Sequence, residues 1–360
     1  MKKLILILIP MLLVIGLSAI EFDISGENRT RAAFYNDPAE KDGGHIDNRL
    51  NIGLDSQLHR NLNFRFAVQI GDTTWGNGGG GIGTGERVHV TEAYLDYMID
   101  SFDARIKLGQ MYWMDRMGLV MDDYFSGLAI SKTFGDNLNT ELIWVKKAEN
   151  VETASDDSDV FIFHAMVDNE MPIGAYLMFG NYEVADYQNL TVMPYLAMEK
   201  DALSLDATVF MDMQMGADTE MGFGGAAKAK LDMTAFELGA DVLVASEHGL
   251  TTISPWYQNG LYIYGIGKYH DGLNQYWGVP YQGNTDLFAS IVGNIKAPLK
   301  EKLDVFAAAG YLMDLGFEVN AGLECTLIPD LFHMQVYGAY GIHDDEINNY
   351  ALGSSLKIEF

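Results

Sequence analysis

Hydrophobic and polar residues alternate along most of this chain, and its last segment, YALGSSLKIEF, shows the pattern clearly. In an extended chain, successive side chains point to opposite sides. One side of this segment carries the apolar residues Leu352, Leu356, Ile358 and Phe360. The other side carries Ser355, Lys357 and Glu359. The segment is therefore predicted to be a β-strand with one face in an apolar environment and the other in water.

Eighteen segments share this period of two and are predicted strands. They cover residues 21–35, 45–58, 62–71, 88–100, 102–112, 125–134, 138–147, 159–168, 173–182, 189–199, 202–214, 222–232, 234–246, 285–296, 302–314, 316–327, 331–342 and 348–360. The pattern is weakest at 125–134 and 316–327, which leaves sixteen strands as the alternative count.

Short connectors alternate with longer ones between these segments. After the N-terminal leader, no stretch of about 18 residues is free of charged and polar residues, which argues against a transmembrane helix. A closed β-barrel satisfies its backbone hydrogen bonds between strands, with tight turns at one end and longer loops at the other. The sequence therefore predicts an all-β fold, a transmembrane antiparallel β-barrel of eighteen strands.

The N-terminus has the features of an export signal. The stretch MKKLILILIPMLLVIGLSA combines two lysines, an apolar core and the small residues Ser18 and Ala19. This pattern predicts a cleaved signal peptide over 1–19 and a single barrel domain over 20–360. An uncleaved helical anchor is the alternative, although the run is short for a bilayer span.

Export of a barrel places it in the outer membrane of a Gram-negative-type bacterium. Its predicted partners are outer-membrane lipid and the barrel-assembly machinery, because the last strand, which ends on Phe360, resembles the C-terminal signature by which outer-membrane proteins are recognised for assembly. The oligomeric state stays open.

Composition narrows the function classes. Without Lys2 and Lys3 of the leader, 21 basic residues stand against 50 acidic ones, a net charge of about −29, so nucleic acid is not an expected partner. The single cysteine, Cys325, has no internal disulfide partner.

No cofactor, metal or catalytic site is predicted. The glycine-rich GNGGGGIGTG at 76–85 lacks the Lys-Ser or Lys-Thr of a phosphate-binding loop. The eight histidines are scattered singly, without the spacing of a zinc hydrolase. No serine-nucleophile elbow or paired-carboxylate signature occurs, so the chain is not expected to be an enzyme.

Residues 86–135 resemble the alginate-export and related porin family. The resemblance consists of a strand with EAYLDY, a tight turn, a strand ending RIKLGQ, a loop with paired aspartates and the segment FSGLAIS. It implies an eighteen-stranded outer-membrane barrel. The family's arginine-rich channel suits an acidic polysaccharide, but Gln110 stands here where the family has an arginine.

A barrel of 16 to 18 strands is too wide for its inward side chains to fill, so polar inward positions are expected to line a water-filled channel. The predicted function is passive diffusion of small hydrophilic solutes, such as saccharides or ions. Two alternatives are a structural or adhesive barrel with an occluded lumen and a barrel enzyme.

The positive charges suggest where the channel is narrow. All eight arginines occur in the first third of the chain, and several face inward by parity. The predicted pore-lining and constriction residues are Arg29, Arg31, Arg49, Arg65, Arg105 and Lys107, with Asp115, Asp122 and Asp123 opposite them on an inward-folded loop over 113–124. A transverse field between the two sets would select solutes. In the alternative interpretation, these charges are solvated and only pair with one another.

The long segment 247–284 is rich in tyrosine and tryptophan. Such rings stack on sugars while their polar groups stay wet, which favours a saccharide-contacting loop formed by Trp256, Tyr257, Tyr264, Tyr276 and Trp277. The same residues would equally suit packing of a long loop onto the barrel mouth.

Overall fold

The computed structural model describes residues 21–36, 43–75, 88–148, 157–183, 185–265, 279–283, 286–343 and 348–360. These residues form eighteen β-strands and no α-helix. Within them, no helix has the length and apolar character needed to cross a membrane. The predicted signal peptide over 1–19 lies outside the described residues.

The strands are β1 (Asp23–Tyr35), β2 (Gly43–His59), β3 (Leu62–Thr74), β4 (Val88–Ile99), β5 (Ala104–Met114), β6 (Asp122–Phe134), β7 (Leu138–Ala148), β8 (Ser158–Val167) and β9 (Ile173–Tyr182). They continue with β10 (Tyr187–Lys200), β11 (Leu203–Met215), β12 (Thr219–Met233), β13 (Phe236–Ala245), β14 (Phe288–Lys300), β15 (Leu303–Leu312), β16 (Gly316–Ile328), β17 (Phe332–His343) and β18 (Asn348–Glu359).

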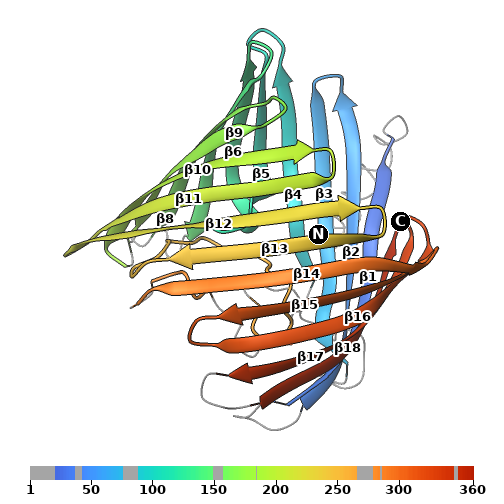
Figure 1. The fold of residues 1–360 in the computed structure, drawn as a ribbon. Helices are drawn as coiled ribbons and strands as arrows, with labels where there is room; N and C mark the ends of the chain where they lie inside the picture. The colour runs from blue at the N-terminus through green and yellow to red at the C-terminus, as the bar shows by residue number, and fades with distance from the viewer. Residues whose placement is uncertain are drawn as a thin grey trace, which may run out of the picture.

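Each strand pairs with the next in antiparallel fashion, and β1 pairs with β18, so the sheet closes into a barrel (Figure 1). At this seam, Gly26 N–H donates to the Phe360 carbonyl at 2.7 Å and Phe360 N–H donates back at 3.0 Å. The predicted eighteen-stranded barrel is confirmed. The weakly patterned segments 125–134 and 316–327 are strands β6 and β16, so the alternative count of sixteen was wrong.

Apolar side chains cover the outer face of the barrel. On β18 the exposed fractions are 57% for Leu352, 40% for Leu356 and 41% for Ile358, although all three are apolar. Large exposed apolar residues recur on most of the other strands, among them β5, β8, β14 and β17. The alternation therefore works as predicted, since it sends one set of side chains outward and the other into the lumen.

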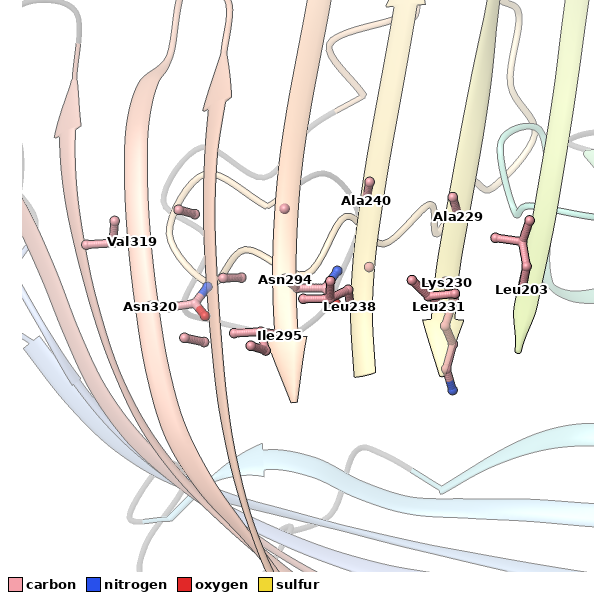
Figure 2. Close-up of a pocket in the computed structure, with 15 residues that line it drawn as sticks. Leu203, Ala229, Lys230, Leu231, Leu238, Ala240, Asn294, Ile295, Val319 and Asn320 are labelled. Carbon is pink, nitrogen blue, oxygen red and sulfur yellow. The ribbon is translucent and has the colours of Figure 1, made fainter. Parts of the chain in front are cut away.

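A hollow of about 760 Å³ lies on this outer face, where successive strands carry small residues. Figure 2 shows several of the residues that line it, among them Ala229 and Ala240. Ala229 on β12 pairs with Ala240 on β13, which pairs with Gly293 on β14 and so brings Ala309 of β15 into the same row. Larger residues such as Leu203 and Val319 border it. The hollow faces away from the lumen and is not part of the site described below.

Candidate functional site

Two segments fold into the lumen and divide it. The first is residues 249–264 of the connection between β13 and β14, which we call the luminal loop. Its residues Leu250, Tyr257, Leu261 and Tyr264 are 0% exposed. They pack against inward-facing residues of the wall, among them Leu243, Val292 and Leu312. A loop that would otherwise stand in solvent therefore shares a core with one side of the barrel.

Polar groups on the inner wall hold this loop in place. The Asp212 carboxylate on β11 accepts from Thr251 N–H at 3.1 Å and from its hydroxyl at 2.6 Å. The Asp241 carboxylate on β13 accepts from the Tyr257 hydroxyl at 2.7 Å. Hydrogen bonds at these distances fix the loop along the wall.

The far end of the loop is bound by β16 and β18. The Glu318 carboxylate accepts three successive backbone N–H groups, from Tyr262 at 2.7 Å, Ile263 at 2.9 Å and Tyr264 at 2.8 Å. The Asn349 side-chain amide donates to the Tyr264 hydroxyl at 2.8 Å. The luminal loop thus runs along the inner wall from β11 to β18.

The second inward segment is the hairpin tip, residues 110–125 of β5, β6 and their connection. Pairing between β4 and β5 stops at Ala93 and Gln110, whereas pairing between β5 and β6 continues to Met114 and Asp122. Gly109 makes the separation possible, because its φ of 132° favours glycine and an added Cβ would lie 2.2 Å from the Ala93 carbonyl oxygen. The tip can therefore leave the wall and enter the lumen.

Contacts across the barrel confirm that the hairpin tip spans the lumen. Arg116 Nε donates to Asp206 on β11 at 2.6 Å, and Arg116 N–H donates to the Tyr176 hydroxyl on β9 at 3.0 Å. The tip also contacts the luminal loop, since Trp256 N–H donates to the Gly118 carbonyl at 3.0 Å. Together the two segments fill the lumen on the side of β7–β18 at this level.

The predicted constriction residue Asp115 lies inside the hairpin tip. Its carboxylate is 0% exposed and accepts N–H groups of its own loop, from Met117 at 3.2 Å, Leu119 at 3.1 Å, Val120 at 2.7 Å and Met121 at 2.9 Å. Burial raises the pKa of Asp115, and the four donors oppose that rise because they favour the carboxylate. Asp115 therefore shapes the loop and does not face the solvent in the lumen.

A cavity of about 570 Å³, which we call the upper cavity, remains between the hairpin tip, the luminal loop and strands β2–β4. The wall contributes Arg49, Asn51, Gln69, His89, Val90 and Thr91, and the two inward segments contribute Gln110, Tyr112, Asp122, Asp123, Tyr124, Trp256 and Gln258. The structure thus brings Arg49 and the two predicted aspartates Asp122 and Asp123 to one cavity. Gln110, where the alginate-export family has an arginine, also lines it.

The two aspartates are held by neutral donors. Asp122 accepts from the Tyr112 hydroxyl at 2.5 Å, and Asp123 accepts from the Ser254 hydroxyl of the luminal loop at 2.5 Å. No ion pair joins either carboxylate to another described residue. Their negative charge is therefore not cancelled by a contacting cation among those residues.

The predicted arginines line the same wall and contact acidic neighbours. Ion pairs join Arg31 to Asp47 at 3.0 Å, Arg49 to Glu27 at 3.2 Å, Arg65 to Glu92 at 2.6 Å and to Asp55, and Arg105 to Asp96. Arg29 lies opposite Arg49 in the register of β1 and β2. Lys107 lies 5.5 Å from the centre of the Tyr94 ring.

Part of this wall charge remains accessible, although the side chains of the Arg31–Asp47 pair are only 6% exposed. The side chain of Arg65 is 27% exposed and that of Arg105 is 49% exposed, whereas core residues on β7–β10 such as Ile143, Ile162 and Met178 are 2% exposed or less. The part of the lumen along β1–β6, which we call the open side, is therefore the part that the inward segments leave unfilled.

A second cavity of about 390 Å³ extends from the open side to β7 and β8, toward the short turns. Arg105, Lys132, Glu141 and His164 line it. Arg105 forms an ion pair with Asp96 on β4, and Asp96 lies opposite Lys107 in the register of β4 and β5. The open side thus carries charged groups from the upper cavity to the short-turn end of the barrel.

The structure separates the predicted saccharide-contacting aromatic residues. Trp256 lines the upper cavity. Tyr257 and Tyr264 are 0% exposed, with their hydroxyl groups bonded to Asp241 and Asn349, so their rings pack the luminal loop and are not available to stack on a sugar. Tyr276 and Trp277 lie outside the described residues.

Solved structures similar to this chain are outer-membrane proteins. OpdO of Pseudomonas aeruginosa superposes with a TM-score of 0.65 at 12% sequence identity, covering 94% of this chain and 97% of that one. OpdK of the same organism, determined with vanillate, gives 0.63 at 11% identity over 94% and 98%. OccAB4 of Acinetobacter baumannii gives 0.58 at 11% identity over 94% and 98%.

The chain has the fold of these outer-membrane porins. Identities this low support the fold and nothing more specific. No protein-family model and no curated protein sequence matches the chain. The resemblance to porins is therefore supported at the level of the barrel, and not for the alginate-export family in particular.

Proposed function

We propose that the protein is an outer-membrane channel through which small hydrophilic solutes diffuse passively along the open side of the lumen. The observation that carries this proposal is the combination of an apolar outer face with an accessible, charged inner wall on β1–β6. Lipid would cover the first and water the second. Neither face requires chemistry at a catalytic residue, so the proposal does not include an enzyme activity.

We further propose that the upper cavity is the selective part of the passage. Arg49 lies on one wall, and Asp122 and Asp123 lie on the hairpin tip facing the same space. Low-dielectric walls strengthen a field between such groups, so a solute with separated charges would be oriented as it passes. Trp256 and the two tyrosines add apolar surface beside the charges.

The wall arginines are expected to compensate the acidic residues beside them. Replacing Arg49, Arg65 and Arg105 together by alanine removes the arginine partners of Asp55, Glu92 and Asp96, whereas Glu27 keeps its ion pair with Lys357 at 3.0 Å. We expect the cation preference to rise, as measured by the reversal potential of purified protein in a planar bilayer with a salt gradient. Unchanged conductance and selectivity would contradict a role for these residues in permeation.

A barrel with a fully occluded lumen is the second candidate, and it is favoured by the two inward segments that fill the side of β7–β18. Liposome flux separates the two functions. A channel admits small sugars and ions into liposomes, whereas an occluded barrel admits neither. In the same preparation we expect no hydrolysis of lipid, ester or peptide substrates.

The remaining proposals concern export and substrate. A leader cleaved after residue 19 would deliver the barrel to the outer membrane, and N-terminal sequencing of the protein purified from that membrane tests the cleavage site.

Neutral saccharides and ions are proposed ahead of an acidic polysaccharide, because Gln110 replaces the arginine of the alginate-export family and the wall arginines have acidic partners.

A further inference from the structure

We propose that Glu318 and Asp212 are positioning residues that set the size limit of the passage, because they fasten the luminal loop to the inner wall. The effect on the size limit rests on the proposed channel function. The attachment of the luminal loop to the wall rests on the hydrogen bonds described below. Neither residue lies at the upper cavity, so each would act on permeation through the loop and not by touching a solute.

The Glu318 carboxylate accepts hydrogen bonds from one continuous stretch of loop backbone. Three consecutive N–H groups, from Tyr262 to Tyr264, converge on its two oxygens at 2.7 to 2.9 Å. Asn320, two positions along the same face of β16, donates to Glu318 at 3.3 Å and to the Gly260 carbonyl at 3.1 Å. Only a carboxylate offers two oxygens that accept without also donating, so no other side chain of this length fits the three donors.

Asp212 holds the opposite end of the loop in a similar way. One of its oxygens accepts from the Thr251 N–H and hydroxyl groups. The other accepts from Thr191 and from the Asn189 amide at 3.1 Å, both on β10. Asp212 and Glu318 are each 0% exposed, and neither forms an ion pair with another described residue.

Because Glu318 and Asp212 are buried without a countercharge among the described residues, each carboxylate depends on its hydrogen-bond donors and the donors depend on the carboxylate. A carboxylate removed from water is stable only when donors satisfy it, and buried N–H groups need acceptors in turn. If Glu318 is truncated, three N–H groups lose their acceptor at once, and the end of the loop can recover hydrogen bonds only by moving into water. The lumen beside β16 to β18 would then open.

The experiment compares Glu318→Ala and the double variant Glu318→Ala/Asp212→Ala with the wild-type protein. Glu318→Gln is the milder variant, because it keeps the volume but turns an NH2 group toward the N–H donors. Glu324→Gln is the matched control: Glu324 lies on the same strand and the same inner face, but its partner is Lys296 at 2.8 Å and not the loop. Heat-dependent mobility on gels shows which variants fold as barrels.

The first readout does not depend on transport. A Leu261→Cys reporter in a Cys325→Ser background lies in the luminal loop at a position that is 0% exposed. We expect maleimide to label it at least about tenfold faster in Glu318→Ala than in the wild-type or Glu324→Gln background, as local opening exposes a buried segment. The second readout is single-channel conductance and the largest sugar that enters liposomes, and we expect both to increase in the Glu318 and double variants.

The outcomes separate the two claims. Unchanged labelling in folded Glu318→Ala and Glu318→Gln would overturn the fastening. Faster labelling without a change in conductance or sugar size limit would overturn the role of the loop in setting the passage. If the wild type conducts nothing while labelling still rises in Glu318→Ala, the proposed channel function is wrong and the fastening is right.

Discussion

At the residue scale, the behaviour of a charged group in this lumen depends on the donors and cations that surround it. Asp115, Asp122 and Asp123 are close in sequence but have different surroundings. The first is enclosed by four N–H groups of its own loop, whereas the other two line the upper cavity. Only the latter pair is placed to act on a passing solute.

Removing the charge of the cavity aspartates should weaken the passage of cations. In the Asp122→Asn/Asp123→Asn variant we expect the cation-to-anion permeability ratio to fall by up to about fivefold, since the two partly exposed charges together contribute roughly 0 to 1 kcal/mol. Reversal potentials in a salt gradient measure this ratio. Asp136→Asn, in the exposed turn between β6 and β7, is the control and should leave it unchanged.

Removing the Asp115 carboxylate should loosen the hairpin tip. Asp115→Ala leaves four loop N–H groups without their acceptor, and each such loss in a buried site costs about 1 to 3 kcal/mol. We expect faster hydrogen exchange over residues 117–121 with little change in the barrel strands. Exchange that matches the wild type would show that the loop does not depend on this side chain.

At the scale of the elements, the β5–β6 hairpin combines two roles. Its lower part is barrel wall, and its tip is a luminal element that packs Met111 and Phe125 into the core shared with β7–β10. The change follows Gly109, since the strand pairing to β4 ends at the next residue, Gln110. Gly109 therefore lies at the point where the two strands leave the wall and enter the lumen.

Blocking the turn at Gly109 should disturb the passage more than the barrel. In Gly109→Val the new side chain meets the Ala93 carbonyl and an unfavourable φ, so we expect the tip to be displaced and the conductance to change by about twofold or more. Gly135→Ala is a suitable control: its φ of 61° imposes backbone strain, but nothing lies within 4 Å of the added Cβ. Equal effects of both substitutions would contradict the steric explanation.

At the scale of the whole molecule, the barrel closes only if its first and last strands pair. The seam pairs β1 with β18, and an added Cβ at Gly26 would lie 2.6 Å from the Phe360 ring. The terminal aromatic residue thus packs directly over the first strand. An open sheet would instead expose two unpaired edges, which is unfavourable in lipid and promotes aggregation in water.

Deleting residues 348–360 should therefore abolish the folded barrel and not merely weaken it. We expect the shortened chain to lack the heat-dependent shift in gel mobility that a closed barrel shows. Phe360→Ala keeps the backbone bonds at the seam and should retain a folded barrel in reduced yield. A shortened chain that still forms a heat-modifiable channel would contradict the requirement for closure.

Much of the fold followed from alternation because each strand has only two faces. Leu356 and Lys357 fall on opposite faces whatever their neighbours do, so the order of the strands and the inward direction of Arg49, Arg65 and Arg105 could be predicted locally. Parity was less informative beyond the wall. The loop over 113–124 was predicted to fold inward, but parity gave no indication that the adjoining ends of β5 and β6 also leave the sheet. That depends on the backbone at Gly109 and on the contact with Ala93.

The sequence by itself determined an apolar exterior, a polar interior and a closed chain of eighteen strands, because these depend on side-chain period and on the need to pair every strand. Only the tertiary structure decided which polar residues face water. Tyr257 and Tyr264 became packing residues, and Asp212 and Glu318 became anchors, through contacts between segments far apart in the chain. Such contacts have no local period, so no pattern along the sequence could reveal them.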